Sequence, residues 1–233
     1  MQAMNALTEE ERSYYSLVRE AFEKLAPVYD LMTLPAVHLR DVAVDFAGAP
    51  AGSSALDVAT GTGSQAIAFA RKGYAVTAID LSEAMLGVAR RKAGSDSVRF
   101  EAGDATRLRF GADGFDVVTT SFALHDMPPS IREKALGEMV RVARPGATIL
   151  IVDYSLPVNA FGRFLVYRLI KLYEGPYYEG FIQSDLPAAL AATGVTVTGE
   201  QAALLGAARI WRGRKGSSRA GPPRESRMGP EAV

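Results

Sequence analysis

The sequence predicts an α/β fold built on a doubly wound, mostly parallel sheet, and two observations support this prediction. First, short apolar runs typical of buried strands alternate with helical periodicity along most of the 233 residues. Second, the run Leu56-Asp-Val-Ala-Thr-Gly-Thr-Gly63 connects one such strand to a helix, and Asp80 ends the strand that follows. A strand, glycine loop, helix, strand and acid in this order are typical of a nucleotide-binding βαβ unit.

Helices are expected ahead of the sheet. Residues 9–31 have apolar side chains at helical spacing, with a break near Pro27, and a second helix is expected over 36–46. The Gly-, Pro- and Ser-rich residues 48–54 then form a loop. We therefore expect an N-terminal helical segment over 9–47.

The central part of the chain predicts five parallel strands and three intervening helices. The strands are expected at 55–59, 75–79, 98–102, 115–120 and 147–153, and the helices at 64–72, 83–93 and 131–143. Ser130 and Glu133 have the spacing of a capping box at the start of the third helix. These elements form the expected cofactor-binding core, residues 54–155.

An aromatic-rich insert over 156–182 follows the fifth strand, and a helix over 185–193 comes next. Two short strands, at 195–198 and 203–211, are expected to pair antiparallel at the end of the sheet. The prediction is a Rossmann-like, seven-stranded sheet with N-terminal helices and a helical lid after strand five. All of it falls in a single domain over residues 1–211.

Composition excludes several classes of protein. The sequence has no cysteine, which excludes disulfides, thiolate metal sites and cysteine nucleophiles. Its longest uncharged stretch, residues 186–199, is too short to span a bilayer and is interrupted by Pro187. Glu9, Glu10 and Glu11 stand where a secretory signal would need basic and then apolar residues. We expect a cytoplasmic protein without a metal site.

The zero net charge hides a basic tail. Residues 212–233 contain six Lys/Arg and two Asp/Glu, so the rest of the chain holds 20 basic and 24 acidic residues. This tail is rich in Gly, Ser and Pro, and we expect it to be disordered. Its charge suits nucleic acid or acidic lipid, but a solvated terminus without a partner is the favoured interpretation. The acidic body argues against a nucleic-acid partner.

Acidic residues are expected near the carboxyl ends of the first three strands, where an open sheet of this kind binds its ligand. These are Asp57, Asp80 and Asp104. Any one of them alone is as readily a helix cap or a loop anchor. Together they cost stability unless a ligand or hydrogen-bond donors satisfy them, so the set indicates a ligand site.

Two cofactors compete for this site. The run Gly61-Thr-Gly-Ser-Gln-Ala66 also fits the dinucleotide pattern, which leaves an NAD(P)-dependent dehydrogenase as an alternative. Asp57, however, lies four residues before Gly61, where its carboxylate would repel a pyrophosphate. S-adenosylmethionine offers an ammonium and a sulfonium instead, and Asp104 adds an acceptor for an adenine amino group. The sequence favours S-adenosylmethionine.

The chain resembles the class I S-adenosylmethionine-dependent methyltransferases, and above all the ubiquinone/menaquinone biosynthesis C-methyltransferase (methyltransferase type 11) branch. The resemblance extends over roughly residues 20–155. The segments that carry it are 26–33 (Ala-Pro-Val-Tyr-Asp-Leu-Met-Thr), 56–63, 79–86 (Ile-Asp-Leu-Ser-Glu-Ala-Met-Leu), 103–106 (Gly-Asp-Ala-Thr), 115–118 (Phe-Asp-Val-Val) and 138–146 (Glu-Met-Val-Arg-Val-Ala-Arg-Pro-Gly).

The resemblance implies a set of cofactor-binding residues: Tyr29, Asp57, Ala59, Gly61, Gly63, Asp80, Leu81, Met85, Asp104, Ala105 and Ser121. In this family pattern Asp57 would orient the amino group of the methionine moiety. Asp80 would bind the ribose hydroxyls, and Asp104 would accept from the adenine amine. For Tyr29 and Met85, plain core packing is an equally good interpretation.

The acceptor is expected to be a small hydrophobic or aromatic molecule, quinone-like, phenolic or lipid. His125 is the candidate base where the acceptor must lose a proton. The quinone branch usually has an Arg-Asn pair where this chain has His125-Asp126, so the acceptor or its deprotonation is expected to differ. A histidine that shapes the pocket is the alternative, and Asp126 is interpreted as an N-cap. A catalytically inactive cofactor-binding module for assembly or regulation is the alternative to an enzyme.

The insert bears on the substrate. Residues 160–173 mix aromatic and aliphatic side chains with Arg163, Arg168 and Lys171. A lid helix over the acceptor pocket is the favoured interpretation, and a peripheral membrane contact is the second. The sequence leaves the oligomeric state open between monomer and homodimer.

Overall fold

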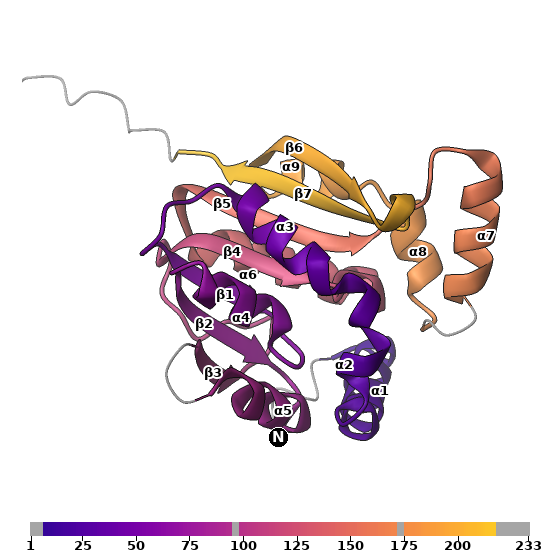
Figure 1. Cartoon of the computed structure of the whole chain (residues 1–233), viewed down its shortest axis with the longest axis horizontal. Helices are drawn as coiled ribbons and strands as arrows, with labels where there is room; N and C mark the ends of the chain where they lie inside the picture. The colour runs from indigo at the N-terminus through magenta and orange to yellow at the C-terminus, as the bar shows by residue number, and fades with distance from the viewer. Residues whose placement is uncertain (1–6, 95–97, 172–174, 218–233) are drawn as a thin grey trace, which may run out of the picture.

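The computed structural model describes residues 7–94, 98–171 and 175–217. Within them, one sheet has the strand order β3-β2-β1-β4-β5-β7-β6 (Figure 1). Its strands are β1 (Ser54–Val58), β2 (Ala75–Asp80), β3 (Val98–Ala102), β4 (Phe115–Ser121), β5 (Ala143–Tyr154), β6 (Val195–Ala203) and β7 (Ala208–Lys215). β1 to β5 are paired in parallel, and β7 pairs antiparallel with both β5 and β6. The predicted doubly wound sheet with an antiparallel terminal pair is confirmed.

Helices cover both faces of this sheet. The α-helices are α1 (Glu9–Leu25), α2 (Tyr29–Met32), α3 (Val37–Ala47), α4 (Ser64–Arg71), α5 (Glu83–Ala93), α6 (Pro129–Val142), α7 (Ala160–Lys171), α8 (Tyr178–Gln183) and α9 (Leu186–Ala192). The described residues also form the 3₁₀ segments η2 (Leu34–Ala36), η3 (Leu124–Asp126) and η4 (Leu204–Gly206). None of these helices combines the length and the apolarity needed to cross a membrane.

The two faces of the sheet are separate apolar cores because neighbouring strand residues point to opposite sides. Val117 and Leu150 belong to the core beneath α3 and α4, whereas Val118 and Ile149 belong to the core beneath α6 and α9. All four side chains are essentially inaccessible to solvent. Fully buried parallel strands of this kind account for the continuous apolar runs in the sequence.

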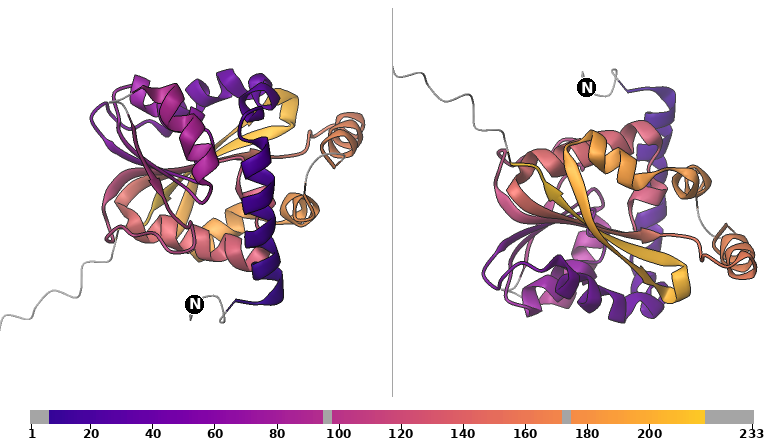
Figure 2. Two further views of the ribbon diagram at one scale, coloured as in Figure 1. Left: turned by 90° about the horizontal axis from the view of Figure 1, so that it is seen from below. Right: turned by 90° about the horizontal axis from the view of Figure 1, so that it is seen from above.

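Helix α1 stands across the edge of the sheet at which the parallel strands end (Figure 2). Its first turn is closed by a capping box between Thr8 and Glu11. Glu11 also accepts hydrogen bonds from Lys134 and Ser130 of α6. At its other side α1 contacts α5. This helix therefore bridges the two helical layers and walls off the carboxyl ends of β1 to β4.

Three local expectations need correction. Helix α6 begins at Pro129 with Pro128 as its N-cap and no side-chain cap, so neither the Ser130–Glu133 capping box nor an Asp126 N-cap forms. The Ser130 hydroxyl instead donates to Glu11. Strand β7 continues to Lys215, so residues 212–215 belong to the sheet and not to a tail. The remainder of the predicted tail, from residue 218 on, lies outside the described residues.

Candidate functional site

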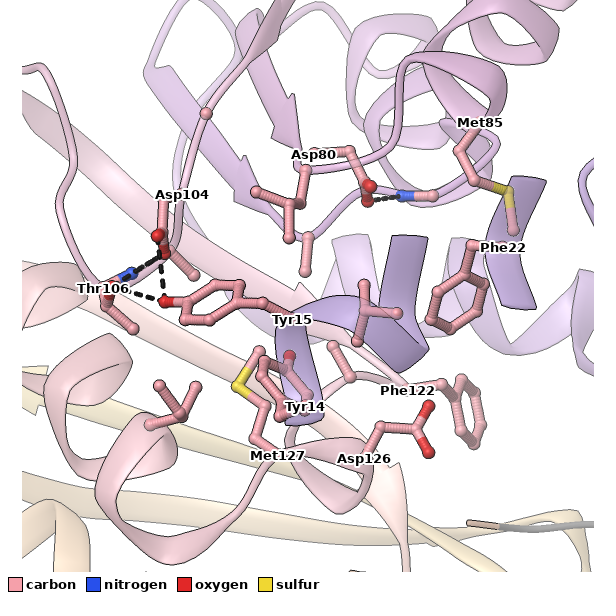
Figure 3. A pocket seen from close by; sticks show the side chains of 18 of the residues that line it. Tyr14, Tyr15, Phe22, Asp80, Met85, Asp104, Thr106, Phe122, Asp126 and Met127 are labelled. Carbon is pink, nitrogen blue, oxygen red and sulfur yellow. Dashed lines mark hydrogen bonds between the residues drawn. The ribbon is translucent and has the colours of Figure 1, made fainter. Parts of the chain in front are cut away.

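A pocket of about 680 Å³, partly open to solvent, lies at the carboxyl ends of the parallel strands, under α1 (Figure 3). Its two sides differ in chemistry. One side carries Asp80 and Asp104 from the ends of β2 and β3, with Met85 of α5. The other carries Tyr14 of α1 and, from the segment after β4, Phe122 and Asp126. A second pocket of about 280 Å³ adjoins it, and Tyr29 lines both.

The glycine loop after β1 is shaped by left-handed backbone. Ala59, Gly61 and Gly63 have φ values of 56°, 56° and 75°. At Gly61 an added Cβ would meet only the Tyr29 ring, at an ordinary contact distance of 3.9 Å, so glycine is favoured there by its left-handed backbone. At Gly63 an added Cβ would lie 2.8 Å from the ring of Phe100. Glycine is therefore needed at residue 63 for packing of the loop on β3.

Asp80 is held in place by the chain itself. Its Oδ2 accepts from the backbone N–H of Gly61 at 2.7 Å, and its Oδ1 accepts from that of Ser82 at 2.8 Å. Burial raises the pKa of Asp80 above its ordinary value, and these donors oppose the shift. Each carboxylate oxygen retains a lone pair for a further donor, and the side chain lines the pocket.

Asp104 connects the loop after β3 to helix α1. Its Oδ1 accepts from the backbone and hydroxyl of Thr106, both at 2.8 Å, and its Oδ2 accepts from the Tyr15 hydroxyl at 2.9 Å (Figure 3). Burial raises the pKa of Tyr15 to about 12, so its phenol remains a donor at neutral pH. The tyrosine thereby fixes α1 over the acidic end of the pocket.

The smaller pocket contains a buried carboxylate that can accept a further hydrogen bond. Asp57 is 1% exposed, and its Oδ2 accepts from the Thr60 hydroxyl at 2.5 Å. In the described part of the chain its Oδ1 has no hydrogen-bond partner, and neither does Oε1 of Gln65. Burial is the main cause that raises the pKa of Asp57 to about 7. Two unsatisfied acceptors in one pocket call for a ligand that donates hydrogen bonds.

A cation lines the same pocket. The Arg40 guanidinium, on α3, donates to the Thr33 hydroxyl at 3.2 Å, and within the described residues no carboxylate forms an ion pair with it. Burial lowers its pKa, although the arginine stays charged at any ordinary pH. The smaller pocket therefore presents acceptors and a cation together. That pattern is complementary to an α-amino acid zwitterion, with an ammonium and a carboxylate.

Helix α2 is fastened over the glycine loop by one ion pair. Lys92 of α5 donates to both carboxylate oxygens of Asp30 at 2.8 Å and to the Ser64 hydroxyl at 2.6 Å. Thr62 also donates to Asp30, at 2.6 Å. These bonds hold Tyr29, the residue next to Asp30, between the two pockets.

His125 lies behind the pocket wall rather than in it. Its side chain is 4% exposed, and Nδ1 is 2.7 Å from Oδ1 of the fully buried Asp153. Asp126, the next residue, lines the pocket and is 28% exposed. Ahead of them, Phe122 has φ 51°, a conformation uncommon for a residue with a side chain. The backbone after β4 is thus turned so that Asp126, and not His125, meets the cavity.

Most residues expected to form the site converge. Those that line the larger pocket are Tyr29, Ala59, Gly61, Asp80, Leu81, Met85, Asp104 and Ala105. Asp57 and Ser121 line the smaller one, together with Tyr29. Gly63 lines neither pocket, and neither does His125.

Sequence reasoning missed Arg40, Tyr15 and the pocket position of Asp126. Tyr15 was recognisable as part of an apolar helical face, but its hydroxyl reaches a residue 89 positions away. Arg40 stands in a helix with no local sign of which face meets a ligand. For Asp126 the signal was its place in the loop after the fourth strand, beside the predicted His125.

Comparison with known proteins agrees with this geometry. Residues 55–146 match a family model described as "Methyltransferase domain". The demethylmenaquinone methyltransferase of Thermus thermophilus is 36% identical over 177 residues, which cover 72% of this chain and 79% of that protein. The protein of the same name from Clavibacter sepedonicus is 42% identical over 146 residues, 60% of this chain. The chain spans 59% of that relative's length, less than two thirds.

Solved structures share the fold at low identity. The magnesium protoporphyrin IX methyltransferase of Synechocystis, solved with bound SAH, superposes with a TM-score of 0.62 at 20% identity, covering 78% of this chain and 84% of that one. A [4+2]-cyclase, SpnF, has a TM-score of 0.62 at 19% identity, with 78% and 82% covered. The fold alone therefore does not determine the reaction.

Proposed function

Because this chain belongs to the class I S-adenosylmethionine-dependent methyltransferases, in the branch of the quinone-biosynthesis C-methyltransferases, we propose that it methylates a reduced naphthoquinone or similar aromatic acceptor. The observation that carries the proposal is the pairing of two pockets. One suits an amino acid zwitterion, and the adjoining one carries strand-end carboxylates suited to a nucleoside. S-adenosylmethionine contains both parts.

The residues of the smaller pocket fit the methionine end of the cofactor. The free Oδ1 of Asp57 and Oε1 of Gln65 are acceptors for its ammonium group, and the Arg40 guanidinium is a donor for its carboxylate. A cation beside Asp57 also offsets the burial that raises the pKa of this carboxyl group. An NAD(P) pyrophosphate would bring negative charge to the same carboxylate, which disfavours the dehydrogenase alternative.

The larger pocket fits the nucleoside end. Asp80 has lone pairs left for two ribose hydroxyls, since its backbone donors occupy one on each oxygen. Leu81 and Met85 provide an apolar surface for a purine ring, next to Asp104. The Tyr15 hydroxyl leaves Asp104 able to accept from an adenine amino group.

When bound, S-adenosylmethionine supplies an electrophilic methyl group on a cationic sulfur that departs as a neutral thioether. The protein's part is to orient the acceptor and to exclude water. Tyr14, Phe122 and Met127 give the acceptor side of the pocket an apolar lining suited to a flat ring. We also propose that His125 contributes to the removal of a proton from the acceptor.

The proposal of a quinone-like acceptor rests on the relatives and on the exposed surface of α7. The relatives are named for demethylmenaquinone or for ubiquinone and menaquinone biosynthesis. On α7, Phe161 and Phe164 are 77% and 65% exposed, and Arg163 and Arg168 stand on the same helix. We propose that this helix rests on an anionic membrane, from which a prenylated acceptor is taken up.

Calorimetric titration with S-adenosylhomocysteine, with NADH as the control, tests the cofactor assignment. We expect micromolar binding of S-adenosylhomocysteine alone. Asp80→Ala should weaken it by more than about tenfold, because two ribose hydroxyls lose their acceptor. Binding of NADH instead would contradict the proposal. Cofactor binding without methyl transfer to any reduced quinone would favour the inactive module.

A further inference from the structure

Three side chains form a row from the acceptor side of the pocket to the centre of the sheet. Asp126 stands at the pocket wall with 28% of its side chain exposed, His125 behind it with 4%, and Asp153 of β5 last with none. Oδ2 of Asp126 is 3.5 Å from Nε2 of His125, whose Nδ1 is 2.7 Å from Oδ1 of Asp153. Each ring nitrogen of the imidazole therefore faces a different carboxylate.

The contact between His125 and Asp153 fixes the orientation of the imidazole. Asp153 also accepts from the backbone N–H groups of Leu124 at 2.9 Å and of Tyr154 at 2.8 Å. With Nδ1 of His125 as the donor to Asp153, Nε2 is the ring nitrogen left to face Asp126. The Tyr154 ring packs edge-on against the imidazole, with 4.6 Å between centroids. The imidazole is thus fixed in orientation, with Nε2 directed at Asp126.

The segment that carries Asp126 is anchored on both sides. Arg132 of α6 donates through Nε to the Leu124 carbonyl at 3.1 Å and through a terminal nitrogen to the Met127 carbonyl at 3.0 Å. Its guanidinium lies 5.0 Å from the centroid of the Phe181 ring. The carboxylate of Asp126 is consequently presented to the pocket by a rigid backbone, as an acid–base group requires.

We propose that Asp126 is the catalytic base of the acceptor reaction, and that His125, clamped by Asp153, is the residue that positions it. The inference rests on the proposed function. The acceptor's O–H bond breaks and its proton forms an O–H bond with Asp126, while the electron pair stays on the acceptor oxygen and is delocalised onto the ring carbon to be methylated. After transfer, the methylated ring carbon loses its proton to solvent water, and the electron pair of that C–H bond restores the aromatic ring. The carbonyl electron pair moves to the acceptor oxygen, which takes the proton back from Asp126, so one proton is released in net.

Turnover of a defined probe tests the catalytic part. The probe is 1,4-dihydroxynaphthalene with a short prenyl chain at one ring position, kept reduced. We expect Asp126→Asn to lower kcat at least about 100-fold with the affinity for S-adenosylhomocysteine unchanged, and Asp126→Glu to restore part of it. His125→Gln should lower kcat less, with KM for the probe little changed. An Asp126→Asn variant with the kcat of the wild type would overturn the proposal.

Nitrogen NMR of the imidazoles tests the contacts of His125 with Asp126 and Asp153 without a measurement of turnover. The sequence has just two histidines, and His38→Asn, at an exposed position of α3, assigns the remaining signals to His125. We expect Asp126→Asn to shift the Nε2 signal and Asp153→Asn to shift Nδ1. Addition of the probe with S-adenosylhomocysteine should move Nε2 in the wild type and not in Asp126→Asn. Equal movement in both would refute a route through Asp126, whereas absence of methylated product from the wild type would refute the proposed function.

Discussion

Asp57 occupies an unfavourable place for a carboxylate. It is 1% exposed, and burial raises its pKa to about 7 from the ordinary value of 3.8. A group whose pKa is raised by folding binds its proton more tightly in the folded state. Its contribution to the free energy of unfolding is therefore full below about pH 4 and is lost as the pH rises to about 7. The protein thus retains a residue that costs stability at neutral pH.

Replacement by a neutral isostere should reveal this cost. We expect Asp57→Asn to raise the melting temperature at pH 8 by roughly 5 °C or more and to leave it nearly unchanged at pH 4. The same change should weaken S-adenosylhomocysteine binding, because an acceptor for the ammonium group becomes neutral. Thermal melts at the two pH values give the answer. A melting temperature that shifts equally at both would show that Asp57 is not buried in its charged form.

Ligand binding should also depend on the protonation of Asp57. A cationic ammonium beside the carboxylate lowers its pKa, so binding releases a proton when the free protein still holds one. We expect the affinity for S-adenosylhomocysteine to rise as the pH increases through about 7, and Asp57→Asn to remove this rise. Calorimetry in two buffers of different ionisation enthalpy measures the proton directly. Proton uptake in place of release would be incompatible with the assignment.

The residues found from sequence and those missed differ in how far their partners lie along the chain. Asp57 and Asp80 belong to a local motif in which strand, glycine loop and acid follow within about 25 residues, so their role can be inferred from the sequence alone. Arg40 and Tyr15 act on groups brought close by the fold alone. His125 was noticed for its titratable ring, yet the fold places its neighbour Asp126 at the pocket, after a left-handed backbone turn at Phe122.

At the scale of elements, α1 is the part of the fold on which the site most depends. Glu11 attaches it to α6 through Lys134 at 2.6 Å and Ser130 at 3.1 Å, and the Lys134 hydrogen bond is the main cause that lowers the pKa of Glu11 to about 2. Because folding lowers this pKa, the attachment is fully present above about pH 4.5 and is lost as the pH falls towards 2.

Glu11→Gln should loosen α1 without unfolding the sheet. We expect faster hydrogen exchange in α1, a melting temperature a few degrees lower and weaker S-adenosylhomocysteine binding, since Tyr15 would no longer be held against Asp104. Glu20→Gln, at an exposed position on the same helix, is the matched control and should change none of these. Unaltered exchange in Glu11→Gln would mean that other contacts fix the helix.

The strands were predictable because burial on both faces of the sheet leaves continuous apolar runs in the sequence, and the longer helices because burial of one face imposes a period of 3.6 residues. The start of α6 was not. Ser130 and Glu133 have capping-box spacing, but the helix begins at Pro129. The Ser130 hydroxyl donates a hydrogen bond to Glu11 of α1 instead. The length of β7 was underestimated because Arg212 and Arg214 look like tail residues. In the fold, Arg212 donates to the Phe46 carbonyl and lies over the Phe46 ring.

At the scale of the whole molecule, α7 projects away from the body (Figure 1). Apart from Ile170, its apolar side chains are not buried against the rest of the protein. A lid packed on the pocket would bury more of them, so the membrane contact is the interpretation we develop. Basic residues on an apolar helix suit the interface of an anionic bilayer.

We expect co-sedimentation with vesicles that contain phosphatidylglycerol, weakened by salt. Phe161→Ser/Phe164→Ser should reduce it about tenfold or more, because two large apolar side chains no longer insert. Val42→Ser, at an exposed position of α3, is the control and should bind as the wild type does. Equal binding by all three proteins would rule out α7 as the contact, and no binding by the wild type would rule out the membrane.

We propose that this site transfers a methyl group from S-adenosylmethionine to a ring carbon of a reduced quinone. The most direct test incubates the purified protein with S-adenosylmethionine labelled in its methyl carbon and reduced 2-prenyl-1,4-naphthoquinone, and follows the product by mass spectrometry. We expect label on a ring carbon. Asp80→Ala and Asp126→Asn should both be strongly impaired, the first in cofactor binding and the second in kcat. Label on oxygen, or no label despite bound cofactor, would contradict this proposal.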